Sequence, residues 1–349
     1  MRRWILCLLF ILALSIPVCA LGEDDLREAL PEEADIYVRD IPHGADFSEG
    51  ISKIMEKVFP TILPTIHAAL RNVSVMLAAL ILCALSLKEG SLTPATIAGV
   101  FAIASAGMLE VQSLAKSGQE ALYQMQSFGD LLLPAMAAST AASGGITASS
   151  AIYAGTAFFT DVLMHGFSGI FLPMTYAYVA VSAAHALCDN DLLSRIARLI
   201  KWSIQSGLKL CLFLFLAYMG ITGLFSGSAD ATAVKAAKLT LSGVVPVVGS
   251  MISDASETVI LGALTLKNAM GIFGMLAVVS ICIGPFLRTG ASYLVMKLST
   301  AAGSALGAKP LISLMDAITD AMGFLLAMTG TGGVLLLISC VCYLKVTTA

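Results

Sequence analysis

The chain has 349 residues, of which 58% are apolar and only 12% are charged. A typical soluble domain carries about 25% charged and about 45–50% apolar residues. This excess of apolar surface is too large for one buried core, so the composition predicts a membrane protein. The formal net charge is −3, and no stretch resembles the basic face of a nucleic-acid-binding protein.

The N-terminal residues predict a secretory signal peptide over residues 1–20. Two arginines precede the apolar stretch Trp4–Ile16, and Val18–Ala20 is a cleavage site of the A-x-A kind. Residues 21–59 are then expected to form a short, acidic, partly disordered extracytoplasmic segment. An amphipathic helix is expected to start near Ser48 at the end of this segment, and residues 60–349 are expected to form a polytopic transmembrane domain.

Six stretches are apolar enough to cross a bilayer, which takes about 20 residues of helix. They are residues 64–87, 93–109, 162–187, 208–225, 270–287 and 322–344. The predicted fold class is therefore all-α, a polytopic membrane helix bundle.

Two further apolar stretches, residues 130–160 and 239–253, are interrupted by proline or glycine. The interrupting residues are Pro134, Gly144, Gly145, Pro246 and Gly249. Irregular backbone at membrane depth persists only where it is buried in protein or lines a wet cavity. We expect each stretch to be a re-entrant segment or a kinked span, and we regard the interrupting residues as candidates for a conduit.

Basic residues favour one topology. Arg195, Arg198 and Lys201 follow one predicted span. Arg288, Lys297 and Lys309 follow another, and short basic loops stay cytoplasmic. With the mature N-terminus outside, six full spans and two re-entrant segments place both groups inside and the C-terminus outside. Eight full spans are the alternative.

The stretch Leu192–Leu208 is amphipathic, with an apolar stripe apart from its basic residues. It predicts a cytoplasmic interfacial helix whose Arg195, Arg198 and Lys201 contact anionic lipid headgroups. A helix that docks a partner protein is the alternative.

Three pairs of prolines or glycines have the same spacing along the chain. Pro134 and Pro246, Pro173 and Pro285, and Gly220 and Gly332 are equally far apart. Transporter folds often contain such internal repeats. The spacing suggests a parallel repeat of residues 128–225 and 240–344.

Charged residues within membrane segments are costly and usually functional. The candidates are Glu110, Asp161, His165, His185, Asp254, Glu257 and Lys267. Asp161 and His165 are one helical turn apart and could form a proton relay; the favoured alternative is that Asp161 caps a helix start. Asp254 and Glu257 resemble the exposed first turn of a helix beginning at Ser253, and Lys267 either pairs with Glu257 or extends outward.

Motifs for catalysis or metal binding are absent from the sequence. The eight cysteines form no CxxC pair and have no nearby histidine, so they predict no zinc site. The sequence also contains no Walker motif, no HExxH and no nucleophile elbow. We expect neither an enzyme nor a cofactor-binding protein.

Three stretches resemble the stage III sporulation protein AE family. They are Leu241–Ser250 (LSGVVPVVGS), Ser253–Glu257 (SDASE) and Leu266–Gly274 (LKNAMGIFG). The resemblance implies a multi-pass protein of endospore-forming bacteria, in the mother-cell membrane around the forespore. It also implies partners, namely other products of the same operon and a forespore membrane protein, in a transenvelope channel or secretion-like complex. It implies no active residues.

Two functions are therefore open. The first is a subunit of that complex, in contact with membrane lipid. The second is a stand-alone secondary transporter with its site at the broken helices. The small-residue stretches 137–150 and 301–308 allow close helix packing within the chain or in a homo-oligomer.

Overall fold

A computed structural model describes residues 23–42, 46–86, 94–143, 145–188, 190–244, 249–306 and 308–345. The side chains of residues 222–264, 266 and 267, and of some residues next to the gaps, lie outside this description. Within the described residues every regular element is a helix.

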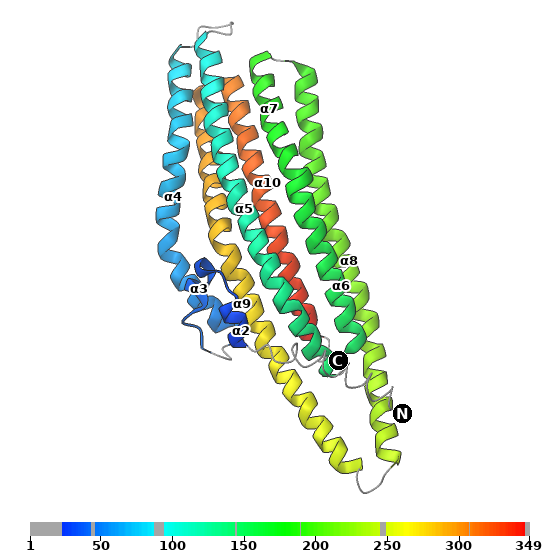
Figure 1. Ribbon diagram of the computed structural model, residues 1–349. Helices are drawn as coiled ribbons and strands as arrows, with labels where there is room; N and C mark the ends of the chain where they lie inside the picture. The colour runs from blue at the N-terminus through cyan, green and yellow to red at the C-terminus, as the bar shows by residue number, and fades with distance from the viewer. Residues whose placement is uncertain are drawn as a thin grey trace.

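Six long helical rods, each antiparallel to the next along the chain, form the bundle (Figure 1). The third rod consists of α6 and α7, joined by one π-helical turn. The bounds are α4 (Phe47–Ser86), α5 (Pro94–Ala142), α6 (Ile146–Gly166), the π turn (Phe167–Phe171), α7 (Leu172–Cys188), α8 (Asp191–Val244), α9 (Gly249–Gly303) and α10 (Lys309–Lys345). A short 3₁₀ turn, Ser304–Leu306, follows α9.

In the part of the chain that the structure describes, six helices are long and apolar enough to cross a membrane, in agreement with the six predicted spans. The helices are longer than a bilayer requires. The 49 residues of α5 extend about 70 Å at 1.5 Å per residue, against about 30 Å for the hydrocarbon core. The bundle must therefore project beyond the membrane. The start of α4 and the end of α10 lie at the same end of the bundle (Figure 1).

The stretch 130–160 does not form the expected re-entrant segment. Pro134 lies half-buried inside α5, which continues to Ala142, and the chain reverses only once before α6 begins. Gly145 is the N-cap of α6, and Gly144 lies outside the described residues. Membrane helices tolerate proline because neighbouring groups satisfy the freed carbonyl. The two halves of this stretch therefore extend α5 and α6.

The stretch 239–253 is described only in part. Helix α8 ends at Val244, α9 begins at Gly249, and Pro246 lies outside the described residues. A re-entrant segment at this place stays a prediction. Because α9 begins upstream of Ser253, the predicted helix start at Ser253 is wrong.

The repeat also stays a prediction. Pro173 and Pro285 lie in α7 and α9, which run in the same direction, and Gly220 and Gly332 lie in α8 and α10, which run the opposite way. Of the third pair, Pro246 is outside the described residues.

Helix α10 is the centre of the bundle and contacts α5, α6, α7, α8 and α9 (Figure 1). Glycines let the neighbouring helices approach it closely. A Cβ atom at Gly118 of α5 would lie 2.9 Å from Thr329 Oγ1, and one at Gly271 of α9 would lie 2.6 Å from Leu344 Cδ2. Small residues have this role in many membrane bundles. Large side chains such as Phe128 and Tyr343 fill the remaining interior.

The acidic segment before α4 is folded, which corrects the expectation of partial disorder for residues 23–42. Helices α2 (Glu23–Glu28) and α3 (Glu32–Val38) dock on α9 and on the start of α4. Apolar residues at helical spacing make this possible, because they share one face. The buried residues are Leu26, Leu30, Ala34, Val38 and Ile41.

Polar contacts hold the same segment in place. The Arg27 guanidinium lies 4.9 Å from the centroid of the Phe273 ring, and it donates a 2.9 Å hydrogen bond to the Ile41 carbonyl. Lys57 of α4 donates to the Ile36 carbonyl at 2.6 Å and pairs with Asp40 at 2.6 Å. The hydrogen bond from Lys57 and its charge lower the pKa of the Asp40 carboxyl.

Candidate functional site

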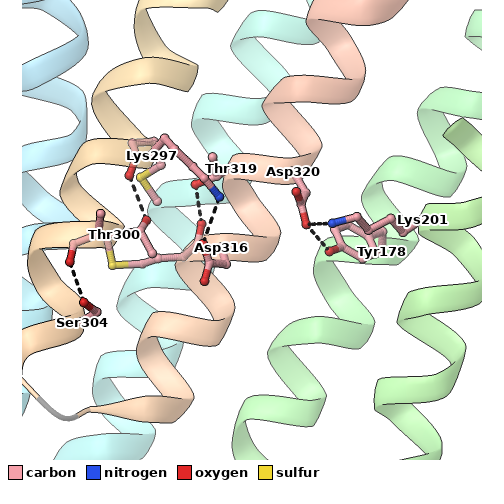
Figure 2. A network of polar contacts seen from close by, with 11 residues as sticks. Tyr178, Lys201, Lys297, Thr300, Ser304, Asp316, Thr319 and Asp320 are labelled. Carbon is pink, nitrogen blue, oxygen red and sulfur yellow. Dashed lines mark hydrogen bonds and ion pairs between the residues drawn. The ribbon is translucent and has the colours of Figure 1, made fainter.

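Two carboxylates of α10 organise a polar junction between four helices (Figure 2). Asp320 Oδ2 accepts a 2.9 Å hydrogen bond from the Tyr178 hydroxyl of α7 and a 2.6 Å ion-paired hydrogen bond from Lys201 Nζ of α8. Tyr178 is buried, whereas the Lys201 and Asp320 side chains are 36% and 27% exposed. A partly buried pair of this kind is screened less than a surface pair.

The second carboxylate lies one helical turn earlier on α10. Asp316 Oδ1 is 3.6 Å from Lys297 Nζ of α9, and about half of each side chain is exposed. Together the two ion pairs link α10 to α8 and to α9, and Tyr178 adds α7 (Figure 2).

A buried carboxylate joins three other helices. Glu110 of α5 is 8% exposed. Its Oε2 accepts a 2.9 Å hydrogen bond from Asn72 Nδ2 of α4, and its Oε1 accepts a 3.0 Å bond from Ser292 Oγ of α9. One turn away, Arg288 of α9 donates a 2.7 Å bond to Ser113 Oγ of α5. Both carboxylate oxygens therefore have partners, as buried polar groups require.

A cleft of about 410 Å³ lies beside Asp320, between α8 and α10. Gln205 and Lys209 of α8 and Tyr293 of α9 supply polar groups, and Leu212 and Phe324 supply apolar wall. Concave apolar sites with a few polar groups are the usual form of small-molecule sites. Its chemistry suits a small amphiphilic or charged solute.

The structure brings Asp161 and His165 together on the outer face of α6. His165 Nδ1 is 3.2 Å from Asp161 Oδ1, and the two side chains are 80% and 61% exposed. Asp161 lies well inside α6, so the favoured interpretation of this residue as a helix cap is wrong. The reason is that α6 begins at Ile146, well upstream of the predicted span 162–187, whose beginning suggests a helix start at Asp161.

The basic residues of α8 separate into two environments. Arg195 and Arg198 are exposed, whereas Lys201 is half-buried and paired with Asp320. The stretch Leu192–Leu208 is the first part of α8 and runs along the bundle rather than forming a separate helix (Figure 1). The predicted separate interfacial helix is therefore wrong, while headgroup contact by Arg195 and Arg198 stays a prediction.

The side chains of three further predicted residues are not described. Asp254, Glu257 and Lys267 have side chains outside the described part of the chain. Among the described residues no group of three His, Cys, Asp or Glu side chains could hold a metal ion, and the described cysteines are free thiols.

Sequence reasoning missed Asp316 and Asp320. The available signal was their spacing of one helical turn at the boundary of the apolar stretch 322–344. It found Glu110 but not its partners, because Asn72 and Ser292 are distant in sequence and carry no charge.

Comparisons with known proteins identify a family for this chain. The family model described as Stage III sporulation protein AE matches residues 44–347. Stage III sporulation protein AE of Bacillus subtilis (strain 168) is 26% identical over 208 residues, which are 60% of this chain and 52% of the relative. The chain thus spans about half the length of the curated relative it matches. No solved structure matches. Because the family model covers most of the chain, this multi-pass membrane protein belongs to the stage III sporulation protein AE family.

Proposed function

We propose that the protein is a membrane subunit of a transenvelope channel or secretion-like complex between mother cell and forespore. Family membership supports a role in sporulation together with other sporulation proteins. The mother-cell membrane facing the forespore is its proposed location. Its proposed partners are other stage III sporulation operon proteins and a forespore membrane protein. Its proposed role is scaffold or wall of a conduit, without catalysis.

The observation that carries this proposal is the packing of the bundle around α10. Helix α10 occupies the centre, and its buried residues run from Leu311 to Tyr343. The carboxylate of Asp316 is paired with Lys297. The carboxylate of Asp320 is paired with Lys201 and accepts a hydrogen bond from Tyr178. A helix so enclosed serves as the axis of a scaffold, and a conduit then belongs at the outer surface of the bundle, between subunits.

Affinity purification from sporulating cells tests the proposal. Full-length tagged protein, solubilised in mild detergent after membrane cross-linking, is expected to retain the other membrane proteins of its operon. The same tag on an unrelated six-span protein of the same cells is the control. Recovery of the chain without any other sporulation protein would contradict the proposal.

A stand-alone secondary transporter is the second candidate, and the cleft beside Asp320 favours it. Lys209 of this cleft offers a positive charge to a solute, beside the paired carboxylate of Asp320. Purified protein in liposomes would then move a small solute alone, and Lys209→Ala would abolish the movement. Arg195→Ala, which removes an exposed charge away from the cleft, is the matched control. Solute movement that requires partner proteins would reject this candidate.

A further inference from the structure

Helix α10 has one open face. Between Leu311 and Tyr343 its exposed residues, together with the half-buried Asp320, recur every seven residues, which is about two helical turns, so they share one face. We call this face the open strip of α10; it consists of Ser313, Asp320, Ala327, Val334 and Val341. Helices α8 and α9 both contact α10 and supply the walls beside the strip. The strip is therefore the floor of a groove.

Two hollows follow one another along the open strip. The upper hollow, nearer the start of α10, is the cleft of about 410 Å³ beside Asp320, and Ala327 belongs to its lining. The lower hollow has a volume of about 290 Å³ and lies between α9 and α10, with Val334 in its lining. Thr331 lines the upper hollow and Gly330 lines the lower, so the two hollows adjoin on consecutive residues. They therefore form one groove along α10.

The two hollows differ in chemistry. The upper hollow offers the Lys209 ammonium, the Gln205 amide and the Tyr293 hydroxyl. The lower hollow is lined by apolar side chains, by two glycines and by Cys282, whose thiol already contacts Met125 Sδ at 3.6 Å. A hydrophilic solute finds no polar partner in the lower hollow, whereas a hydrocarbon chain is removed from water there. The groove thus has a polar end and an apolar end.

The upper hollow carries an uncompensated positive charge. The Asp320 carboxylate is neutralised by Lys201, which reaches it from α8 at 2.6 Å (Figure 2). Lys209 forms no ion pair with any residue in the described part of the chain. An anionic group therefore complements this end of the groove. Basic pockets between membrane helices bind anionic lipid headgroups in this way.

The groove opens on a side of the bundle away from α2 and α3. These helices contact α9 through Arg27, which lies over Phe273. Phe273 and the groove residue Cys282 are nine residues, or about two and a half helical turns, apart, so they lie on opposite faces of α9. Beside the groove, the exposed large side chains of α8 that follow Lys209 are all apolar as far as residue 221; they are Leu210, Phe213, Leu214, Leu216 and Ile221. A membrane lipid can therefore reach the groove along α8 without displacing α2 or α3.

We propose that this groove binds an anionic phospholipid, with its phosphate at Lys209 in the upper hollow and an acyl chain in the lower hollow. The order of polar and apolar lining along α10 matches the order of headgroup and chain in such a lipid. Bound there, the lipid fills the space between α8 and α9 and becomes part of the bundle. The site does not depend on the proposed complex. It competes with the second candidate function, because a headgroup and a solute cannot share the upper hollow.

Lipid binding by the purified full-length chain tests the headgroup end. Fluorescent phosphatidylglycerol is titrated into the protein in non-ionic detergent micelles, and phosphatidylcholine is the zwitterionic comparison. Lys209→Gln is expected to weaken the binding of phosphatidylglycerol about fivefold, the effect of one lysine at an anionic lipid surface. Lys116→Gln removes an exposed charge of α5 outside the groove and is the matched control. Equal affinities of the two variants, or equal affinities for the two lipids, would overturn the proposal.

Two valines of the open strip test the chain end. Val334 and Val341 are 40% and 38% exposed, but Val334 lines the lower hollow and Val341 does not. A phenylalanine at position 334 fills the hollow, so Val334→Phe is expected to weaken lipid binding by a similar factor, while Val341→Phe leaves it unchanged. If both variants bound the lipid as the parent chain does, the acyl chain would not lie in the lower hollow.

Glycerol phosphate separates a lipid from a soluble anion, since it carries the same phosphate without a chain. It is expected to displace phosphatidylglycerol only at concentrations far above that of the lipid. Displacement at the lipid's own concentration would mean that the upper hollow takes a soluble anion, which would reject the lipid and favour the second candidate function. Co-purification of sporulation proteins is a separate result: the complex stands if partners are recovered and the lipid does not bind, and the lipid site stands in the reverse case.

Discussion

Two groups of charged side chains in the bundle differ in what faces them. The interhelical junctions, formed around Asp320, Asp316 and Glu110, turn each carboxylate toward a partner on another helix. The outer faces of α5 and α6 carry exposed charges, among them Lys116, Asp130 and Asp161, and the contact of Asp161 with His165 lies within one helix. Since both groups belong to membrane helices, their charge alone does not separate them; the direction of the side chain does.

The difference indicates a division of roles. A junction between helices fixes which helices are neighbours and costs stability when one partner is lost. An outward charge contributes little to the stability of the isolated chain, but it determines whether lipid, water or protein can lie against that face of the helix. Substitutions in the two groups should therefore affect different measurements.

Asp320→Ala is expected to have the largest effect on stability. It leaves Lys201 without its carboxylate and Tyr178 without its acceptor. The free energy of unfolding should fall by about 2–3 kcal/mol, less than for a fully buried pair, because 36% of Lys201 and 27% of Asp320 are exposed. Reversible unfolding in mixed micelles measures this loss.

A double-mutant cycle with Lys201→Met controls the Asp320 prediction. The double variant removes both charges, so it should recover part of the loss seen in Asp320→Ala alone. Purely additive losses would mean that the ion pair does not couple α8 to α10.

Glu110→Ala is expected to cost somewhat less, about 1–2 kcal/mol, because it leaves two neutral donors, Asn72 and Ser292, without an acceptor. Glu110→Gln keeps an acceptor oxygen and should cost less than Glu110→Ala. The same unfolding measurement checks both. An equal loss in the two variants would argue that the volume of the side chain matters and its hydrogen bonds do not.

The sequence was sufficient for the helical class and the number of spans. Those features depend on composition and on runs of about 20 apolar residues, which are local properties. The prediction from sequence was wrong where a proline lies inside a helix that packs against other helices. Pro134 predicts a break locally, yet α5 continues through it, with Pro134 half-buried against neighbouring helices.

The polar contacts could be predicted only in part from the sequence, for a related reason. Asp161 and His165 are close in sequence, so helical periodicity was enough to bring them together. The partners of Asp320 come from α7 and α8, more than a hundred residues away. No local pattern encodes which helices become neighbours, and the small residues that set close approach, such as Gly118, are common throughout the chain.

Substitutions of the outward charges on α5 are expected to leave the isolated chain nearly as stable as before. Lys116→Ala and Asp130→Ala should each change the free energy of unfolding by about 0.5 kcal/mol or less, because both side chains are exposed. A loss of stability comparable to that of Asp320→Ala would remove the distinction between the two groups.

The smallest effect is expected at Asp40, on the docked segment that precedes α4. The hydrogen bond from Lys57, and then its charge, lower the pKa of Asp40 in the folded state. A carboxyl with a lowered folded pKa stabilises the fold above its unfolded pKa of about 3.9, and this contribution disappears as pH falls through the lower folded value.

Docking of α2 and α3 should therefore weaken slightly below about pH 4. Hydrogen exchange of the α3 amides between neutral and acidic pH, corrected for intrinsic rates, measures the change. Lys57→Met should remove the part of the pH dependence that comes from Asp40. Lys53→Met is the matched control, since Lys53 pairs with Glu49, contacts Asp40 only at its backbone carbonyl (3.4 Å) and is the weakest influence on the pKa of Asp40. If both variants kept the parent pH profile, the contact between Lys57 and Asp40 would contribute nothing to docking, and the buried apolar face of α2 and α3 would be sufficient to hold the segment.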